Sequence, residues 1–86
     1  MTHILIIEDE ENIRTGLKDL LEAEHYQVST AEDGKTGLSL ALSNTADLVI
    51  LDIMLPHVDG YEILKAVRDA NLDTPVILLS AKTQEL

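Results

Sequence analysis

The sequence of 86 residues contains no cysteine, phenylalanine or tryptophan, and its only aromatic residues are Tyr26 and Tyr61. Because cysteine is absent, disulfide bonds and thiolate metal sites are excluded. The core must therefore be built almost entirely from Leu, Ile, Val and Ala. A chain of this length suits one small domain, which buries only about 60–65% of its unfolded surface.

Positive charge is also scarce, with six Lys and Arg residues against sixteen Asp and Glu and a net charge of −10. This balance argues against nucleic acid or an anionic membrane as a direct partner, because such binding needs clustered basic side chains. No apolar stretch approaches the ~20 residues of a membrane span, and no signal peptide is visible. We therefore expect a cytoplasmic domain whose acids either aid solubility or converge on a cation.

Short apolar runs alternate with segments of helical periodicity. Residues 4–7, 48–51 and 76–79 are unbroken aliphatic runs, and residues 26–30 alternate more weakly. Apolar residues recur at helical spacing in three segments between them, at residues 13–21, 38–42 and 63–67. The resulting order, βαβαβαβ, predicts an α/β fold with a parallel sheet covered by helices on both faces.

Acidic and hydroxyl side chains follow the clearest predicted strands. Glu8 and Asp9 follow the first, Asp52 ends the third, and Ser80 and Ala81 follow the fourth. Ligands of such sheets bind beyond the carboxyl ends of the strands. A single acid there is more often a solvated loop residue or a helix cap. Three converging acids would raise one another's pKa unless a hard cation such as Mg²⁺ lay between them.

The loop after the first strand argues against a nucleotide site. A dinucleotide site would have a glycine-rich turn there, whereas residues 8–12 read Glu-Asp-Glu-Glu-Asn. These acids would repel a phosphate unless a metal ion stood between them. The loop therefore favours a metal-bridged phosphoryl group.

Three segments, ILIIEDE, DLVILDIMLPHVDGYEIL and TPVILLSAK, make the chain resemble the receiver domains of bacterial two-component response regulators. The segments lie in the order of that family. The resemblance implies a flavodoxin-like, doubly wound sheet with strand order 2-1-3-4. It also identifies Pro56 and Gly60 with the loop that leads into the third helix.

The resemblance implies a Mg²⁺ site with four contributors. Asp9 and Asp52 would bind the ion directly, and Glu8 would bind it through water. Met54 would supply its backbone carbonyl, which leaves the side chain at this position free to vary.

The same resemblance implies that Asp52 is the phosphoacceptor, with a sensor histidine kinase as partner and no turnover activity expected. The Ser80 hydroxyl would contact the phosphoryl group, and Ala81 would leave room for it. Phosphorylation would be coupled through Ser80 to the face around the fourth strand.

The family pattern also includes a fifth strand that ends in a lysine, and a last helix. Nothing in this sequence matches them, so we expect residues 1–86 to be a truncated receiver domain with weakened transfer chemistry. The strand at residues 76–79 would then be an apolar edge. Such an edge predicts a homodimer or a strand-exchanged oligomer.

Two other functions are compatible with parts of this pattern. One is a receiver-like interaction or folding module that is never phosphorylated. The other is a hydrolase of the haloacid dehalogenase type, although that family needs a second Asp where Met54 stands. His3, His25 and His57 are not clustered, so we expect surface histidines rather than metal ligands or phosphorelay residues.

Overall fold

The computed structural model describes residues 1–79, and the predicted site residues Ser80 and Ala81 lie outside this part. Strands and helices alternate along the chain as β1 (His3–Ile7), α1 (Glu11–Ala23), β2 (Gln27–Ala31), α2 (Gly34–Leu42), β3 (Leu48–Asp52), α3 (Gly60–Asp69) and β4 (Val76–Leu79). This order confirms the predicted βαβαβαβ pattern.

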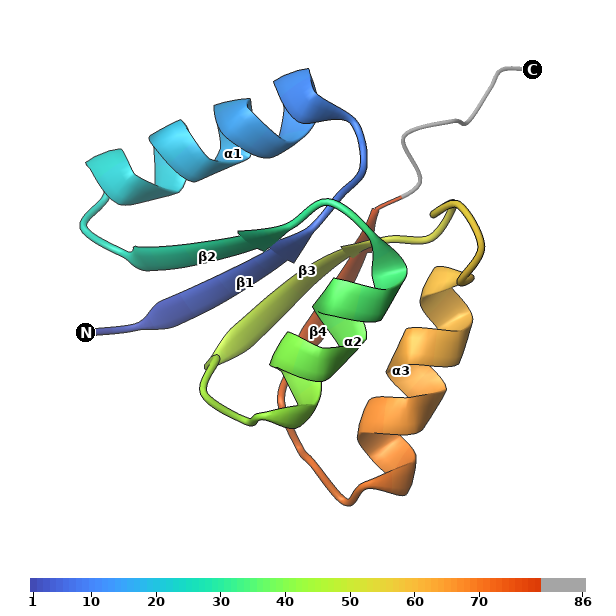
Figure 1. Cartoon of the computed structure of the whole chain (residues 1–86). Helices are drawn as coiled ribbons and strands as arrows, with labels where there is room; N and C mark the ends of the chain where they lie inside the picture. The colour runs from blue at the N-terminus through green and yellow to red at the C-terminus, as the bar shows by residue number, and fades with distance from the viewer. Residues whose placement is uncertain (80–86) are drawn as a thin grey trace.

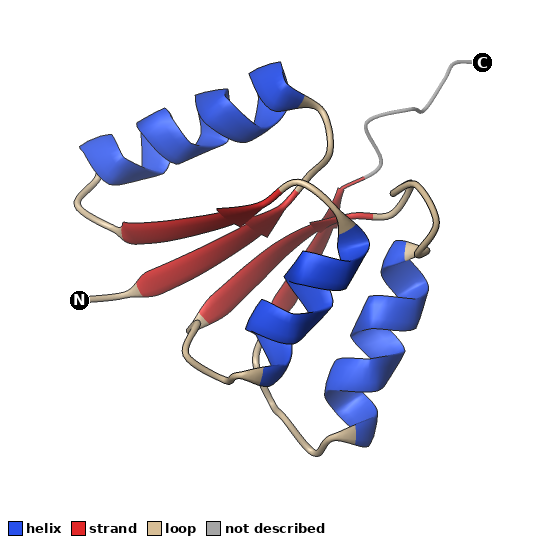
Figure 2. Cartoon of the chain, in the orientation of Figure 1, coloured by secondary structure: helices blue, strands red, loops and turns tan. Residues whose placement is uncertain are grey.

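Within residues 1–79, four strands form one parallel sheet in the order β2-β1-β3-β4, as predicted for a flavodoxin-like fold. Helix α1 covers one face of the sheet, and α2 and α3 lie together on the other (Figure 1). Colouring by secondary structure shows the same three layers, with the strands between the helices (Figure 2). The sheet is therefore doubly wound.

Strand β1 shows why its sequence is an unbroken apolar run. Leu5 and Ile7 pack into the core beneath α2 and α3, whereas Ile4 and Ile6 pack into the core beneath α1. Successive side chains of a strand point to opposite faces, so a strand with helices on both sides needs apolar residues at every position. The central position of β1 follows from this composition.

The order of the strands reverses direction at β1, because the chain runs outward to β2 and then returns past β1 to β3. The carboxyl ends of β1 and β3 are adjacent there, with Ile7 in register with Leu51. Binding sites of open α/β sheets lie at such a reversal. The fold thus places Glu8 and Asp52 at its expected ligand site.

Acidic side chains cap the N-termini of the three helices within residues 1–79. The Glu10 carboxylate accepts the N–H groups of Asn12 and Ile13 at the start of α1, and Asp33 accepts that of Thr36 in α2. These carboxylates satisfy backbone donors that have no partner within the helix. Within residues 1–79, no helix is long and apolar enough to cross a membrane.

Candidate metal centre

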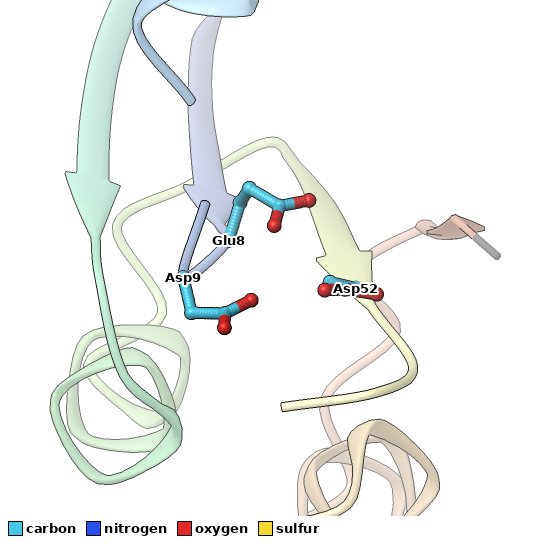
Figure 3. Close-up of side chains that lie close together, drawn as sticks. All are labelled: Glu8, Asp9 and Asp52. Atoms are coloured by element: carbon cyan, nitrogen blue, oxygen red, sulfur yellow. The ribbon is translucent and has the colours of Figure 1, made fainter. Parts of the chain in front are cut away.

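Three carboxylates meet at the carboxyl ends of β1 and β3. One oxygen each from Glu8, Asp9 and Asp52 lie within 4.8 Å of one another. Glu8 and Asp9, which follow the end of β1, point toward Asp52 at the end of β3 (Figure 3). Glu8 and Asp52 are both 0% exposed, and Asp9 is partly exposed. The structure therefore brings together the three acids that the sequence predicted to converge.

The chain turns sharply just after β1. The Glu8 N–H still bonds the Ala31 carbonyl at 3.0 Å, which continues the pairing with β2. Consecutive side chains of a strand would point to opposite faces, yet the carboxylates of Glu8 and Asp9 reach the same site. A bond of 3.0 Å from the Glu10 N–H to Glu8 Oε2 helps to hold this turn.

Asp52 is fixed by the loop that follows it. The Met54 N–H donates to Asp52 Oδ1 at 3.1 Å, and the Ile53 N–H bonds the Leu79 carbonyl of β4 at 3.0 Å. Gly60 packs closely against the backbone of Asp52. A Cβ atom at position 60 would lie only 2.6 Å from the Asp52 carbonyl oxygen. The backbone around Asp52 thus has little freedom to move.

Burial and the neighbouring acids disfavour the charged form of Glu8 in this cluster. Burial raises the pKa of the Glu8 carboxyl, the N–H of Glu10 opposes this rise, and the nearby charge of Asp52 adds to it. Within residues 1–79, Glu8 Oε1 accepts no hydrogen bond from a donor. A buried carboxylate in this state needs either a proton or a cation.

A divalent cation suits this donor set. All the converging atoms are carboxylate oxygens, which hard cations prefer, and Mg²⁺ needs only one or two protein carboxylates because it keeps several waters. An open pocket of about 740 Å³ adjoins the cluster and is lined by Asp9, Asp59, Glu62 and residues 53–57. The site therefore fits Mg²⁺ and has space for a further ligand.

The predicted contribution of the Met54 carbonyl stays a prediction. The Met54 side chain is exposed, in agreement with a role that does not use it. Ser80 and Ala81 lie outside the described residues, so their predicted contacts with a phosphoryl group also stay predictions.

Sequence reasoning missed two residues near the site or the sheet. Arg14 donates to the backbone carbonyls of Glu8 and Asp9, a contact that no local pattern of the sequence indicates. His3, predicted to be a surface histidine, is half-buried and makes hydrogen bonds that the sequence does not predict. Its ring bonds Ser29 Oγ at 2.7 Å and the Thr45 carbonyl at 3.0 Å, and so joins β1 to β2 and to the α2–β3 loop.

Comparison with known proteins identifies the family. The response regulator receiver domain family matches residues 4–86, and the chain belongs to this family. Receiver domains are in general phosphoacceptors rather than turnover enzymes, and they bind Mg²⁺ at an acidic site. The assignment removes the haloacid dehalogenase alternative.

Curated relatives include response regulators of staphylococci. The chain is 51% identical over 85 residues to the response regulator SaeR of Staphylococcus epidermidis, with 99% of this chain and 37% of that protein covered. It is 49% identical over 83 residues to the response regulator ArlR of Staphylococcus saprophyticus, with 96% and 37% covered. The chain thus spans little more than a third of the length of these relatives.

Two solved structures that match the chain contain the same response regulator, one in a complex with Mg²⁺ and BeF and the other in a complex with a histidine kinase. The response regulator TrrA of Thermotoga maritima in complex with Mg²⁺ and BeF superposes with a TM-score of 0.89 at 42% identity, covering 96% of this chain and 72% of that one. TrrA in complex with the histidine kinase ThkA superposes with a TM-score of 0.87 at 42% identity, covering 98% and 72%. These neighbours share the fold of the chain as well as its sequence pattern.

Proposed function

We propose that Asp52 accepts a phosphoryl group, with Mg²⁺ bound beside it, from a phosphohistidine of a sensor histidine kinase. The observation that carries this proposal is the convergence of Glu8, Asp9 and Asp52 within 4.8 Å at the reversal point of the sheet. Two of these carboxylates, Glu8 and Asp52, are buried, and the raised pKa of the Glu8 carboxyl beside a charged neighbour is typical of a functional site.

The chemistry is nucleophilic transfer to a carboxylate. An Asp52 oxygen attacks phosphorus, and the bond from phosphorus to the histidine nitrogen breaks with its electron pair remaining on nitrogen. Because the other ring nitrogen of the phosphohistidine is protonated, neutral imidazole leaves. Bound Mg²⁺ would neutralise charge on the acceptor and on the transferred group. Asp9, Asp52 and the Met54 carbonyl would hold the ion directly, and Glu8 would hold it through water.

The remaining assigned residues would act after transfer. The Ser80 hydroxyl would donate to a phosphoryl oxygen, and the small Ala81 side chain would leave room for the group. A kinase as donor is supported by the structure of TrrA bound to the histidine kinase ThkA. Because such a donor presents its phosphohistidine in the cytoplasm of bacteria, we place the chain in that compartment.

Acetyl phosphate tests the transfer without knowledge of the kinase. The full chain is incubated with acetyl phosphate and Mg²⁺, and its intact mass is measured with and without EDTA. We expect the mass of one phosphoryl group, dependent on Mg²⁺ and absent from Asp52→Asn. If the wild-type chain stays unmodified under conditions that label another receiver domain, the proposal is wrong.

A second candidate function is an interaction module that self-associates without phosphorylation. Within residues 1–79, β4 is hydrogen-bonded to β3 alone, and Ile77 at its centre is 49% exposed. An apolar edge strand of this kind favours pairing with another copy. Homodimerisation or strand exchange through β4 is compatible with either function.

A further inference from the structure

Arg14 contacts the backbone that carries the two consecutive acids of the site. It lies in the first turn of α1, and its Nη1 donates to the Glu8 carbonyl at 3.0 Å and to the Asp9 carbonyl at 3.3 Å. Its side chain is only 17% exposed, and its Nη2 lies 4.0 Å from Glu32 Oε1. The guanidinium therefore joins the β1–α1 loop to the loop after β2.

This contact bears on how two consecutive residues can direct their carboxylates to the same site. Glu8 and Asp9 are consecutive, so their carboxylates can meet only if the backbone leaves the extended conformation of β1. The turn also brings two consecutive carbonyl oxygens, at the negative ends of their dipoles, to one donor atom. A charged donor with two hydrogens on one nitrogen satisfies both oxygens and holds them together.

We propose that Arg14 is a positioning residue that sets this turn and thereby the affinity of the acidic cluster for a divalent cation. The inference rests on the proposed Mg²⁺ site, but it assigns Arg14 no contact with the ion. Groups that orient metal ligands without touching the metal typically change metal affinity 10–100-fold when mutated.

Other contacts hold α1 in place without Arg14. Leu17 and Leu21 pack on the core beneath the helix, and Glu10 caps its first turn. Loss of the guanidinium should therefore loosen the acidic turn more than it unfolds the domain. This separation allows a positioning role to be distinguished from a merely structural one.

The test is a titration of the full chain with Mn²⁺, followed by the electron paramagnetic resonance signal of free Mn²⁺. We expect Arg14→Gln to bind Mn²⁺ about tenfold more weakly than wild type. Arg14→Lys, which keeps the charge but lacks the planar group, should have an affinity for Mn²⁺ between those of wild type and Arg14→Gln.

The matched control is Glu32→Gln, which removes the exposed partner of Arg14 and should change the affinity for Mn²⁺ by less than about twofold. Wild-type affinity in Arg14→Gln, with only a lower melting temperature, would overturn the proposal.

A second readout needs no metal. The carbonyl ¹³C shifts of Glu8 and Asp9 are compared in metal-free wild type and Arg14→Gln, and both should change while those of β3 stay constant. If the wild type binds no Mn²⁺, the proposed function fails, and these shifts still decide whether Arg14 holds the turn. Unchanged shifts at both carbonyls would refute the positioning role.

Discussion

Glu8 links the acidic cluster to the stability of the fold. Burial raises its pKa above the ordinary value of 4.5, so the folded chain without metal holds this proton more tightly than the unfolded chain. The contribution of Glu8 to stability is therefore greatest below pH 4.5 and declines as the pH rises toward the raised pKa. At neutral pH, above the ordinary value, the raised pKa of Glu8 makes the metal-free fold less stable than it is below pH 4.5.

Glu8→Gln should consequently stabilise the metal-free protein at neutral pH, because the amide has a similar shape and no charge. Urea unfolding in EDTA, at neutral pH and at a pH below the ordinary Glu pKa, measures the difference. The advantage of the variant should be larger at neutral pH. Saturating Mg²⁺ should reduce or reverse it, since the wild-type carboxylate then has a cation. A variant that is less stable than wild type at neutral pH in EDTA would contradict this account.

Gly60 gives a second prediction at the scale of one residue. A Cβ atom there would lie 2.6 Å from the Asp52 carbonyl oxygen and 2.7 Å from the Ile53 Cα, both backbone atoms that cannot rotate away. We expect Gly60→Ala to destabilise the fold by about 1–3 kcal/mol, as for overpacked sites, and to displace Asp52. Chemical denaturation and Mn²⁺ affinity should both show the loss.

Gly16 is the matched control for this substitution. It lies in the exposed part of α1, and a Cβ atom there would meet nothing within 4 Å. Gly16→Ala should therefore stabilise the fold by about 0.5–1 kcal/mol through helix propensity. Equal effects of the two substitutions would show that close packing at Gly60 does not matter.

At the scale of elements, each of the three helices in the described part of the chain is followed by a residue in the left-handed region. His25, Asn44 and Asn71 follow the helices with φ values of 71°, 59° and 63°. Asn tolerates this conformation better than most residues do. Glycine adopts it without steric cost, because it has no Cβ atom to approach the following carbonyl oxygen. His25 is therefore the least suited of the three to its position.

We expect His25→Gly to raise the free energy of unfolding by up to about 1 kcal/mol, and Asn44→Gly by less. Urea denaturation of the two variants beside wild type measures both changes. His25 is exposed, so no buried contact offsets the gain. A loss of stability in His25→Gly would show that the imidazole has a role that the contacts of α1 do not reveal.

The strands were easier to predict than the boundaries of the helices. Residues 48–51 and 76–79 were recognisable because burial on both faces demands unbroken aliphatic runs. The third helix begins at Gly60, before the apolar residues 63–67, because Asp59 and Glu62 form a capping box that periodicity does not register. The acidic cluster was predictable because parallel strands end at one edge.

Contacts made by long side chains could not be predicted in this way. The reach of Arg14 to two carbonyls depends on the turn after β1, and the bonds of His3 depend on the pairing of β1 with β2. Neither geometry is encoded in a local pattern. Such contacts become visible only when the elements have been placed in space.

At the scale of the whole molecule, β4 is an edge strand within residues 1–79, and we propose that copies of the chain associate through it. Ile77 is 49% exposed, and a lysine on an edge strand opposes pairing with another chain. We expect the wild type to be a dimer or larger by light scattering and Ile77→Lys to be a monomer. Leu20→Lys, an exposed position on α1, is the control and should leave the size unchanged. A monomeric wild type would contradict self-association.

The central claim, that Asp52 is the phosphoacceptor, is tested most directly by trapping the modified residue. After reaction with acetyl phosphate and Mg²⁺, borohydride reduces an aspartyl phosphate to homoserine, and peptide mass spectrometry locates it. We expect homoserine at position 52, dependent on Mg²⁺. Reduction at Asp9 or Glu8 instead, or no reduction while another receiver domain is trapped in parallel, would contradict it.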